Sequence, residues 1–460
     1  MDRENKNRMG TEAIVPLLFK LSIPSILSMA IQALYNIVDS IYIGNYDQQA
    51  LTGLSIAFPI QMILIAIAVG TGIGTSSLIS RELGKGNRKK ASNAAEHVLL
   101  LSIVYGIVLA ILGSLFSRNI ISIFTNNVDI IDYGTRYIRI ILIGSTAMFV
   151  PMIANNILRG EGNTLVPMIS MLIGSIINII LDPFMIFGIG IFPEWGIEGA
   201  AVATVVSRLL SGIFIVFMIF KADNEINVNF NKFVFNINII KDIYIVGFPA
   251  MVMQFLASFM IGGLNIIVGT YNETAIAALG IYFRLQSFVF MPVFGLNQGY
   301  MPIIGYNYGH NNPERMKKAI KYGFIVAFTF TTLGFILFQT IPTHLIKLFI
   351  SNSEDSEELI LLGSKALTTI SIAFPIIGPA IIGSTTFQAI GKGLPSLTLS
   401  FLRQIILLLP LAYILGKIGG VNNIWYSFPL SEFISSLVMV FWLRRALKNI
   451  FEDMNNTKKS

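Results

Sequence analysis

The sequence contains no cysteine and few charged residues, and both absences limit what the protein can be. Without cysteine there is no disulfide, no thiolate metal site and no cysteine nucleophile. The three histidines, His97, His310 and His344, are scattered and lack metal-ligand spacing. Charged residues make up only 12% of the 460 residues, whereas a soluble domain carries about 25%. Most side chains therefore face something other than water.

Apolar stretches recur along the whole chain, and 54% of its residues are hydrophobic. A continuous apolar run of about 18 residues or more can cross the ~30 Å hydrocarbon core of a bilayer as a helix. The sequence predicts an all-α integral membrane protein with a polar, uncleaved N-terminus and no nucleic-acid partner. Twelve spans are expected, at 21–43, 52–80, 92–117, 132–155, 165–187, 199–220, 243–268, 274–303, 315–340, 356–386, 395–416 and 424–443.

Basic residues gather in alternate connections and at both termini. The connections after the second and eighth spans hold the densest groups, Arg81, Lys85, Arg88, Lys89 and Lys90 in one and Arg315, Lys317, Lys318 and Lys321 in the other. Cytoplasmic loops carry an excess of lysine and arginine. We therefore expect both termini in the cytoplasm, and an even number of spans follows from that orientation.

A gapless internal repeat relates the two halves of the chain. Apolar bias does not explain the matches of proline, glycine, glutamine, tyrosine and asparagine in this repeat. A shift of 225 residues superposes Pro24 on Pro249, Gly44 on Gly269, Tyr46 on Tyr271, Ala50 on Ala275, Phe58 on Phe283, Gln61 on Gln286, Gly70 on Gly295, Gly74 on Gly299, Gly84 on Gly309 and Asn87 on Asn312. A later pair, Gly160–Gly162 and Gly391–Gly393, needs a further shift of six.

The repeat predicts two six-helix lobes that enter the membrane in the same direction. Their expected bounds are 1–220 and 243–460, and the expected symmetry is a pseudo-two-fold axis along the membrane normal. Residues 221–242 form the linker, either as an interfacial strap or as a plain connection.

Ionisable groups at membrane depth are costly and mark functional sites. Helix rise places Asp39 on the first span and Asp182 on the fifth span at one level near the outer surface. Tyr137 and Thr204 fall at the same level, and Asn178 lies one turn before Asp182 on the same helix face. A carboxyl group in such a place can bind and release a proton as its access to water alternates. A sodium ion at Asp39, Asp182 and Asn178 is the other possibility, and the structural alternative is a capped, kinked helix.

Arg208, Arg284, Arg403 and Glu432 fall near the predicted midplane. One interpretation is a buried structural ion pair between Glu432 and either Arg403 or Arg284; the other is that an arginine contacts an anionic part of a substrate. The small residues of 70–77 predict close helix packing. Methionines such as Met260 and Met291 are typical of a core, and with Gln286 and Arg284 they are candidates to line a substrate cavity.

With these residues assembled, the chain resembles the multidrug and toxic compound extrusion (MATE) family, in particular its MepA-type branch. The motifs that carry the resemblance are LYNIVDSIYIGN around Asp39, SRELGKGNRKKA after the second span, LRGEGNT after the fourth, NIILDPFMIFG around Asp182 and FRLQSFVFMPVFGLNQG in the eighth. The resemblance covers almost the whole chain.

The resemblance implies a bacterial cytoplasmic-membrane exporter, not an enzyme, that contributes to antibiotic resistance. It implies alternating access and antiport of organic, cationic, drug-like compounds against protons or sodium, by a monomer without a cofactor. Asp39, Asp182, Asn178 and Tyr137 would take the coupling positions, with Thr204 as a looser match. The repeat partner of Asp39 is Leu264, which favours protons and an N-lobe site. A flippase for a lipid-linked sugar of the same superfamily is the alternative.

Overall fold

A computed structural model describes residues 7–46, 48–221, 224–349 and 356–457. All regular elements within these ranges are helices. Eleven helices of the described residues are long and apolar enough to cross a membrane, and a bent pair brings the number to twelve. The predicted all-α membrane fold with twelve spans is confirmed.

Contacts divide the chain into two units, which we call the N-unit (Ile23–Phe248) and the C-unit (Met1–Ser22 together with Pro249–Ser460). In this division the described residues 7–22 join the C-terminal half, whereas the predicted N-terminal lobe included them. The two boundaries fall inside helices, one residue before Pro24 and immediately before Pro249, which are partners in the repeat.

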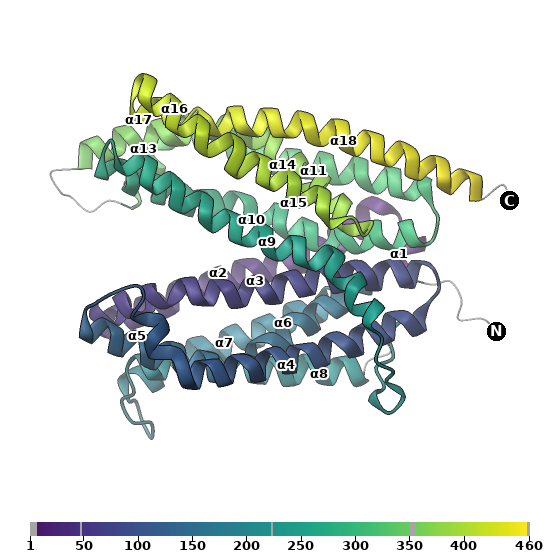
Figure 1. The fold of residues 1–460 in the computed structure, drawn as a ribbon, viewed down its shortest axis with the longest axis horizontal. Coiled ribbons are helices and arrows are strands. Elements are labelled where there is room, and N and C mark those ends of the chain that lie inside the picture. Colours follow the sequence, from purple (N-terminus) through teal and green to yellow (C-terminus); the bar gives the residue numbers. More distant parts are fainter. Residues whose placement is uncertain (1–6, 47, 222–223, 350–355, 458–460) are drawn as a thin grey trace. The chain divides into compact units, whose positions relative to one another are not determined.

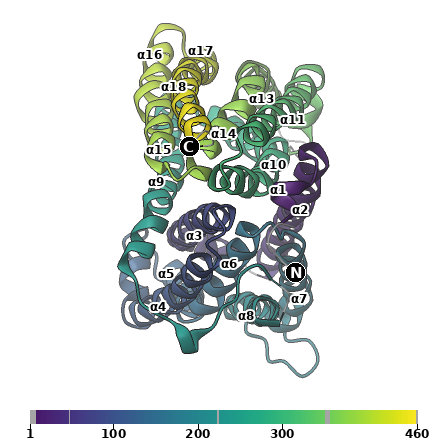
Figure 2. The same cartoon turned by 90° about the vertical axis from the view of Figure 1, so that its right-hand side faces the viewer.

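The helices of the N-unit are seen nearly end-on in Figure 2. They are the greater part of α2 (Ile14–Tyr46), α3 (Gln48–Gly84), α4 (Arg88–Ile121), α5 (Val128–Ile143), α6 (Ser145–Gly160), α7 (Leu165–Phe187) and α8 (Ile197–Lys221), followed by the short η1 (Phe230–Lys232) and the start of α9 (Ile237–Gly269).

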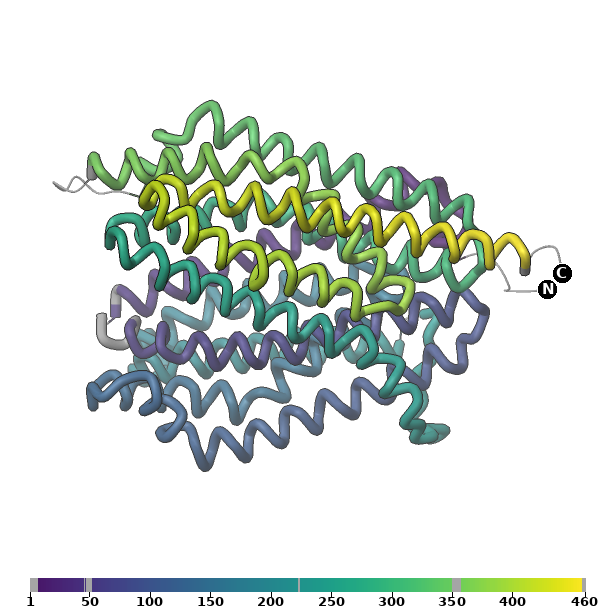
Figure 3. Tube along the Cα trace, turned by 45° about the horizontal axis from the view of Figure 1, so that its top comes forward, coloured from purple at the N-terminus to yellow at the C-terminus, as the bar shows by residue number. Residues whose placement is uncertain are grey.

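The C-unit begins with α1 (Arg8–Thr11) and the first turns of α2, and its helices run side by side in Figure 1. The rest are most of α9, α10 (Glu273–Gly309), α11 (Pro313–Thr340), α12 (Pro342–Lys347), α13 (Ser356–Ile370), η2 (Ser371–Ala373), α14 (Phe374–Ala389), α15 (Gly393–Phe401), the π-helical η3 (Leu402–Leu408), α16 (Leu409–Gly419), α17 (Val421–Ile424) and α18 (Ser427–Thr457). Figure 3 shows α18 running beside the stretch from α15 to α16, and its contacts with η3 and α16 agree.

The fourth predicted span is broken. Its two parts, α5 and α6, meet at Gly144 with a bend of 53°. A side chain on Gly144 would overlap Val205 of α8, so the glycine allows close packing where the helix turns. The hydroxyl of Ser145 then donates to the carbonyl of Gly106 over 3.0 Å. Apolar composition alone cannot detect this bend, because both parts are equally apolar.

The backbone repeats the 225-residue relation seen in the sequence. Gly86 and Asn311, which are 225 apart, both adopt positive φ, at 76° and 55°. The next residues, Asn87 and Asn312, cap α4 and α11, because each side chain accepts a hydrogen bond from the backbone three residues ahead. The matched asparagines are therefore explained by helix capping.

The later repeat register needs a correction. The left-handed glycines that follow α6 and α14 are Gly162 and Gly391, and they are 229 residues apart. Backbone hydrogen bonds agree with this shift, since Asn163 donates to Leu158 and Lys392 donates to Phe387. The further shift is thus four residues instead of six. Aligning the two Gly-X-Gly motifs by residue type pairs Gly160 with Gly391. The turn geometry pairs Gly162 with Gly391, because these are the glycines that adopt the left-handed conformation.

The linker packs against the start of α4 in the N-unit, in the manner of the strap that the sequence allowed. Three of its backbone N–H groups donate to α4 side chains: Asn227 to Ser92 (2.9 Å), Asn229 to Glu96 (2.8 Å) and Asn236 to His97 (2.8 Å). Because α4 satisfies these backbone donors, the described part of the linker, residues 224–242, has a fixed course.

Candidate functional site

Two aspartates and an asparagine meet inside the N-unit. Asp182 and Asn178 lie on α7, where the Asn178 amide donates to the Asp182 carboxylate over 3.1 Å. Asp182 is completely buried, and α7 continues past Pro183 to Phe187, so the aspartate does not end the helix. Asp39, from α2, lies close enough to Asp182 for their carboxyl groups to interact directly.

Three oxygens of this cluster are buried without a hydrogen-bond donor among the described residues. They are Oδ1 of Asp39, Oδ1 of Asn178 and Oδ2 of Asp182. A buried oxygen that lacks a donor costs free energy unless a proton or a cation satisfies it. No group of three or more His, Asp or Glu side chains in the described ranges could hold a metal ion. A cation here would therefore rest on two carboxyl groups and an amide.

Tyr137 of α5 borders the aspartates. Its side chain is 3% exposed, and its hydroxyl accepts a hydrogen bond of 3.0 Å from the Gln61 amide of α3. Asp39 and Asp182 both lie within electrostatic range of the phenol. The structure thus brings Tyr137 to the aspartates and adds Gln61 as a donor that fixes it.

Arg208 differs from the prediction. It makes no ion pair with a carboxylate of the described residues, and instead donates to the Tyr35 hydroxyl over 2.6 Å. Its guanidinium also lies 5.3 Å from the centre of the Tyr35 ring. Tyr35 precedes Asp39 by one turn of α2. Arg208 therefore contacts a residue next to the aspartates and not the aspartates themselves.

Thr204 is not joined to the cluster by a hydrogen bond. It lies half-buried on α8, where its backbone carbonyl accepts from the Ser207 hydroxyl over 2.9 Å, and its own hydroxyl makes no hydrogen bond with a described residue. The predicted coupling role of Thr204 therefore has no contact to support it.

The structure brings Arg403 and Glu432 together in the C-unit. Arg403 lies in η3 and Glu432 in α18, and Nη1 is 2.9 Å from Oε1. The hydroxyl of Tyr282 lies near both, buried and without a partner among the described residues. Arg284, the other candidate partner of Glu432, is exposed on α10 and makes no ion pair with a described residue.

The four candidate cavity residues lie on α9 and α10 of the C-unit. Gln286 and Met291 are half-buried, whereas Met260 packs against the apolar cluster around Leu264 and Tyr282. Neither Arg284 nor Gln286 makes a hydrogen bond with a described residue.

Two residues of the N-unit site were missed by the sequence analysis. Tyr35 could have been found because it lies four residues before Asp39, which puts both side chains on one face of the helix. Gln61 could have been found because it is a polar residue within an apolar span and superposes on Gln286 in the repeat. Polar side chains inside apolar helices mark such positions even when they carry no charge.

Twelve spans in repeated halves, with paired acids inside one half, define a membrane transporter rather than an enzyme. The model of the MatE family matches residues 24–184 and 249–414, and the chain belongs to this family of multidrug efflux transporters. Proteins of the family are transporters, as the resemblance implied.

Three relatives match nearly end to end. A protein named FAD transporter from Shewanella oneidensis is 28% identical, over 96% of this chain and 97% of its own length. A probable multidrug resistance protein NorM from Thermotoga maritima is 29% identical, over 95% of each chain. Multidrug export protein MepA from Staphylococcus aureus is 25% identical, over 93% of each chain.

Solved structures of transporters match equally well. A MOP superfamily transporter from Pyrococcus furiosus, whose binding pocket is described as having reverse polarity, superposes with a TM-score of 0.91 at 27% identity, over 98% of this chain and 99% of its own. An outward-facing MATE transporter superposes with a TM-score of 0.90 at 27% identity, over 98% of this chain and all of its own.

Proposed function

We propose that the chain exports organic, drug-like compounds by antiport, with Asp39 and Asp182 as the coupling groups. The observation that carries the proposal is the adjacency of these two carboxyl groups and their unpartnered oxygens. Two neighbouring carboxyl groups at membrane depth cannot both stay ionised without a proton or a cation between them. Occupation and release of that ion would couple to alternating access.

Protons are the proposed coupling ion. A sodium ion would need several oxygen ligands, and this cluster offers three buried oxygens that lack a donor among the described residues. A proton shared between the carboxyl groups satisfies one of them with no further ligand. The repeat partner of Asp39 adds to this proposal, since Leu264 is buried in an apolar cluster and supplies no carboxylate at the matching position.

The proposed location is the cytoplasmic membrane of a bacterium, with both chain ends in the cytoplasm. The basic residues after α3 and α10 support this orientation. All the proposed coupling residues come from one unit of one chain, which is consistent with function as a monomer.

The test uses Asp39→Asn and Asp182→Asn, with Asp129→Asn as the matched control, because Asp129 is an exposed aspartate at the start of α5 in the same unit. In an efflux-deficient host, both site variants should leave drug susceptibility at the level of empty vector. The control should protect like the wild type. Membrane abundance of each variant is measured alongside.

Vesicle transport identifies the ion. Efflux driven by a pH gradient should continue in sodium-free buffer, and an absolute sodium requirement would replace the proton proposal with a sodium one. Normal efflux by both site variants would overturn the coupling role of the acids.

A second substrate class is anionic. The Shewanella relative is named for FAD, and Arg284 offers an exposed cation without an ion-pair partner among the described residues. The same vesicles can be tested with FAD, cationic dyes and a lipid-linked sugar. Uptake of FAD, with its loss in Arg284→Gln, would favour the anionic class, and translocation of only the lipid would favour a flippase.

A further inference from the structure

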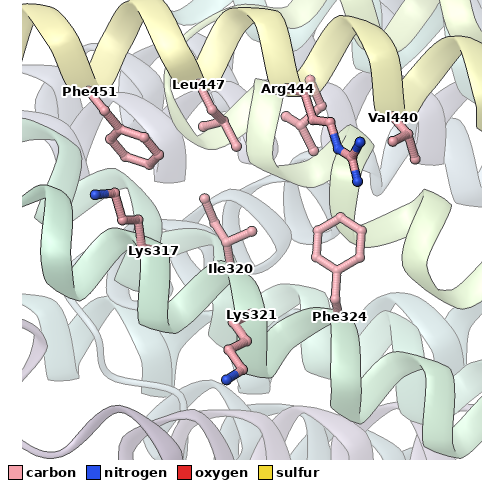
Figure 4. Close-up of a pocket in the computed structure, with 9 residues that line it drawn as sticks. Lys317, Ile320, Lys321, Phe324, Val440, Arg444, Leu447 and Phe451 are labelled. Atoms are coloured by element: carbon pink, nitrogen blue, oxygen red, sulfur yellow. The ribbon is translucent and has the colours of Figure 1, made fainter.

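A groove of about 450 Å³ lies in the C-unit between the start of α11 and the last turns of α18 (Figure 4). It is lined by Lys317, Ile320, Lys321 and Phe324 of α11 and by Val440, Leu443, Arg444, Leu447 and Phe451 of α18. In Figure 4, Arg444 and Phe451 point from α18 toward α11, while Lys317, Ile320 and Phe324 point back from α11. None of these residues takes part in the proposed coupling site.

The lining combines cations with apolar side chains and contains no carboxylate. Lys321 and Arg444 make no hydrogen bond or ion pair with a described residue. Lys317 pairs with Glu314 over 3.1 Å, but both side chains are well exposed, and such a pair contributes little. The Lys317 ammonium also lies 5.1 Å from the centre of the Phe451 ring at the edge of the groove. The groove therefore carries an uncompensated positive charge.

Apolar side chains continue from the groove along both helices. One turn beyond Phe324 on the same face of α11 is Phe328, which is 49% exposed. One turn before Val440 on α18 is Leu437, which is 58% exposed. Helix α14 packs against both α11 and α18. The cations thus lie at one end of an exposed apolar lane between two spans.

The cations lie at the end of the C-unit where the apolar helices end and polar turns and termini begin. Arg315 donates from α11 to the backbone carbonyl of Glu12, over 2.7 Å, and Asn311 donates to the carbonyl of Met454, over 3.3 Å. The N-terminal segment, the turn before α11 and the end of α18 therefore share this end of the C-unit. Lysine and arginine at such a position face the headgroup region of a bilayer.

We propose that this groove binds an anionic phospholipid. Its phosphate would lie between Lys317 and Arg444, because Lys321 points away from α18 in Figure 4, and an acyl chain would follow the lane of Phe324 and Phe328. Basic pockets between membrane helices on the cytoplasmic side have the chemistry for acidic headgroups. A free phosphate would use the cations but leave the apolar lane uncovered, and a neutral lipid would use the lane but leave the cations unpaired. Only an anionic amphiphile satisfies both.

The experiment measures lipid retention by the purified, full-length protein in detergent, by native mass spectrometry with titrated lipid. The double variant Lys317→Gln/Arg444→Gln removes two lining cations. Its matched control, Lys318→Gln/Arg445→Gln, removes two exposed cations of the same helices that do not line the groove. The titrants are dioleoyl phosphatidylglycerol, dioleoyl phosphatidylcholine, short-chain dihexanoyl phosphatidylglycerol and inorganic phosphate.

We expect the dioleoyl phosphatidylglycerol dissociation constant to rise roughly 30-fold in the lining variant, from about 1 kcal/mol for each cation. The control should stay within about twofold of the wild type. Phosphatidylcholine and the short-chain lipid should bind more weakly than the long-chain anionic lipid. Thermal stability without added lipid should be equal in all variants, since the changed side chains are exposed.

Three results would overturn the proposal. Equal losses in both double variants would mean a general effect of surface charge. Unchanged affinity in the lining variant would mean that the lipid binds elsewhere. Displacement of the lipid by inorganic phosphate at similar concentration would identify a site for a soluble anion. Because binding is measured in detergent, none of these results depends on antiport or on the proposed orientation.

Discussion

The close crossing of α3 and α9 in the N-unit predicts that a larger residue at Gly74 lowers the stability of the protein. A Cβ atom on Gly74 would overlap the carbonyl oxygen of Ile243 and lie 3.0 Å from the nitrogen of Gly247. Both obstacles are backbone atoms, so no side-chain rotation can relieve the overlap. Gly74→Ala must therefore push one helix away from the other.

Two effects oppose each other in this substitution. Alanine favours a helix over glycine by about 0.5–1 kcal/mol. Overpacking a tight contact costs about 1–3 kcal/mol, and the upper part of that range applies because backbone meets backbone. The balance is a loss of about 1–2 kcal/mol. At Gly280 of α10 a Cβ would meet nothing within 4 Å, so Gly280→Ala should show the gain of about 0.5–1 kcal/mol alone.

The repeat supplies a second crossing of the same kind. Gly299 is the partner of Gly74, and a Cβ there would lie 2.8 Å from the nitrogen of Ser22 on α2. Thermal unfolding in detergent, followed by tryptophan fluorescence and by loss of the monodisperse peak, should give lower Tm for Gly74→Ala and Gly299→Ala. It should give an equal or higher Tm for Gly280→Ala. A Tm for Gly74→Ala at or above the wild type would refute the reasoning from the crossing.

Two further predictions concern buried charge. Arg403→Gln should lower stability by about 3–5 kcal/mol, because it strands the buried carboxylate of Glu432. Glu432→Gln should cost less, because the side chain of Arg403 is 29% exposed and water can reach it. The charge-swapped double variant should recover most of the loss in thermal unfolding. No recovery would remove the structural role of the pair. Burial in the loop after α6 raises the pKa of Glu161 from 4.5 to about 8, so its contribution to stability is complete below pH 4.5 and is lost as the pH rises toward 8. Between pH 4.5 and 7 that loss of stability amounts to about 3 kcal/mol. Glu161→Gln keeps an acceptor for the Ile226 N–H and cannot ionise, so Tm should fall less with rising pH in this variant. An unchanged dependence of Tm on pH would contradict the assignment to Glu161.

Hydropathy predicted the spans well, because the bilayer requires long apolar helices. It did not predict where the helices end. α18 runs to Thr457 and α2 starts at Ile14, well outside their apolar centres. Polar turns can extend a helix into water when capping or packing satisfies the backbone, and apolar composition carries no signal for them. Asn87 and Asn312 did carry such a signal, as capping residues before α4 and α11.

The sequence predicted the charged residues of the N-unit site. Asp39 and Asp182 stand out because an acid inside an apolar helix needs a reason. Depth counting placed both at one level, but it could not say which helix faces face each other. Tyr35 and Gln61 were missed because neutral polar side chains are common in membrane helices, and only the fold shows that they hold Arg208 and Tyr137. Thr204 was included by depth alone.

The same scaffold position has opposite chemistry in the two halves. Asp39 borders a buried polar cluster, whereas its repeat partner Leu264 is fully buried in an apolar cluster with Tyr282 and Phe428. A carboxyl group at position 264 would lie among side chains that are apolar apart from the Tyr282 hydroxyl, at a cost of several kcal/mol. The C-unit pairs its own buried acid, Glu432, with an arginine. An ion that moves must bind where its ligands are otherwise unsatisfied, and the three donor-free oxygens of the N-unit cluster meet that condition.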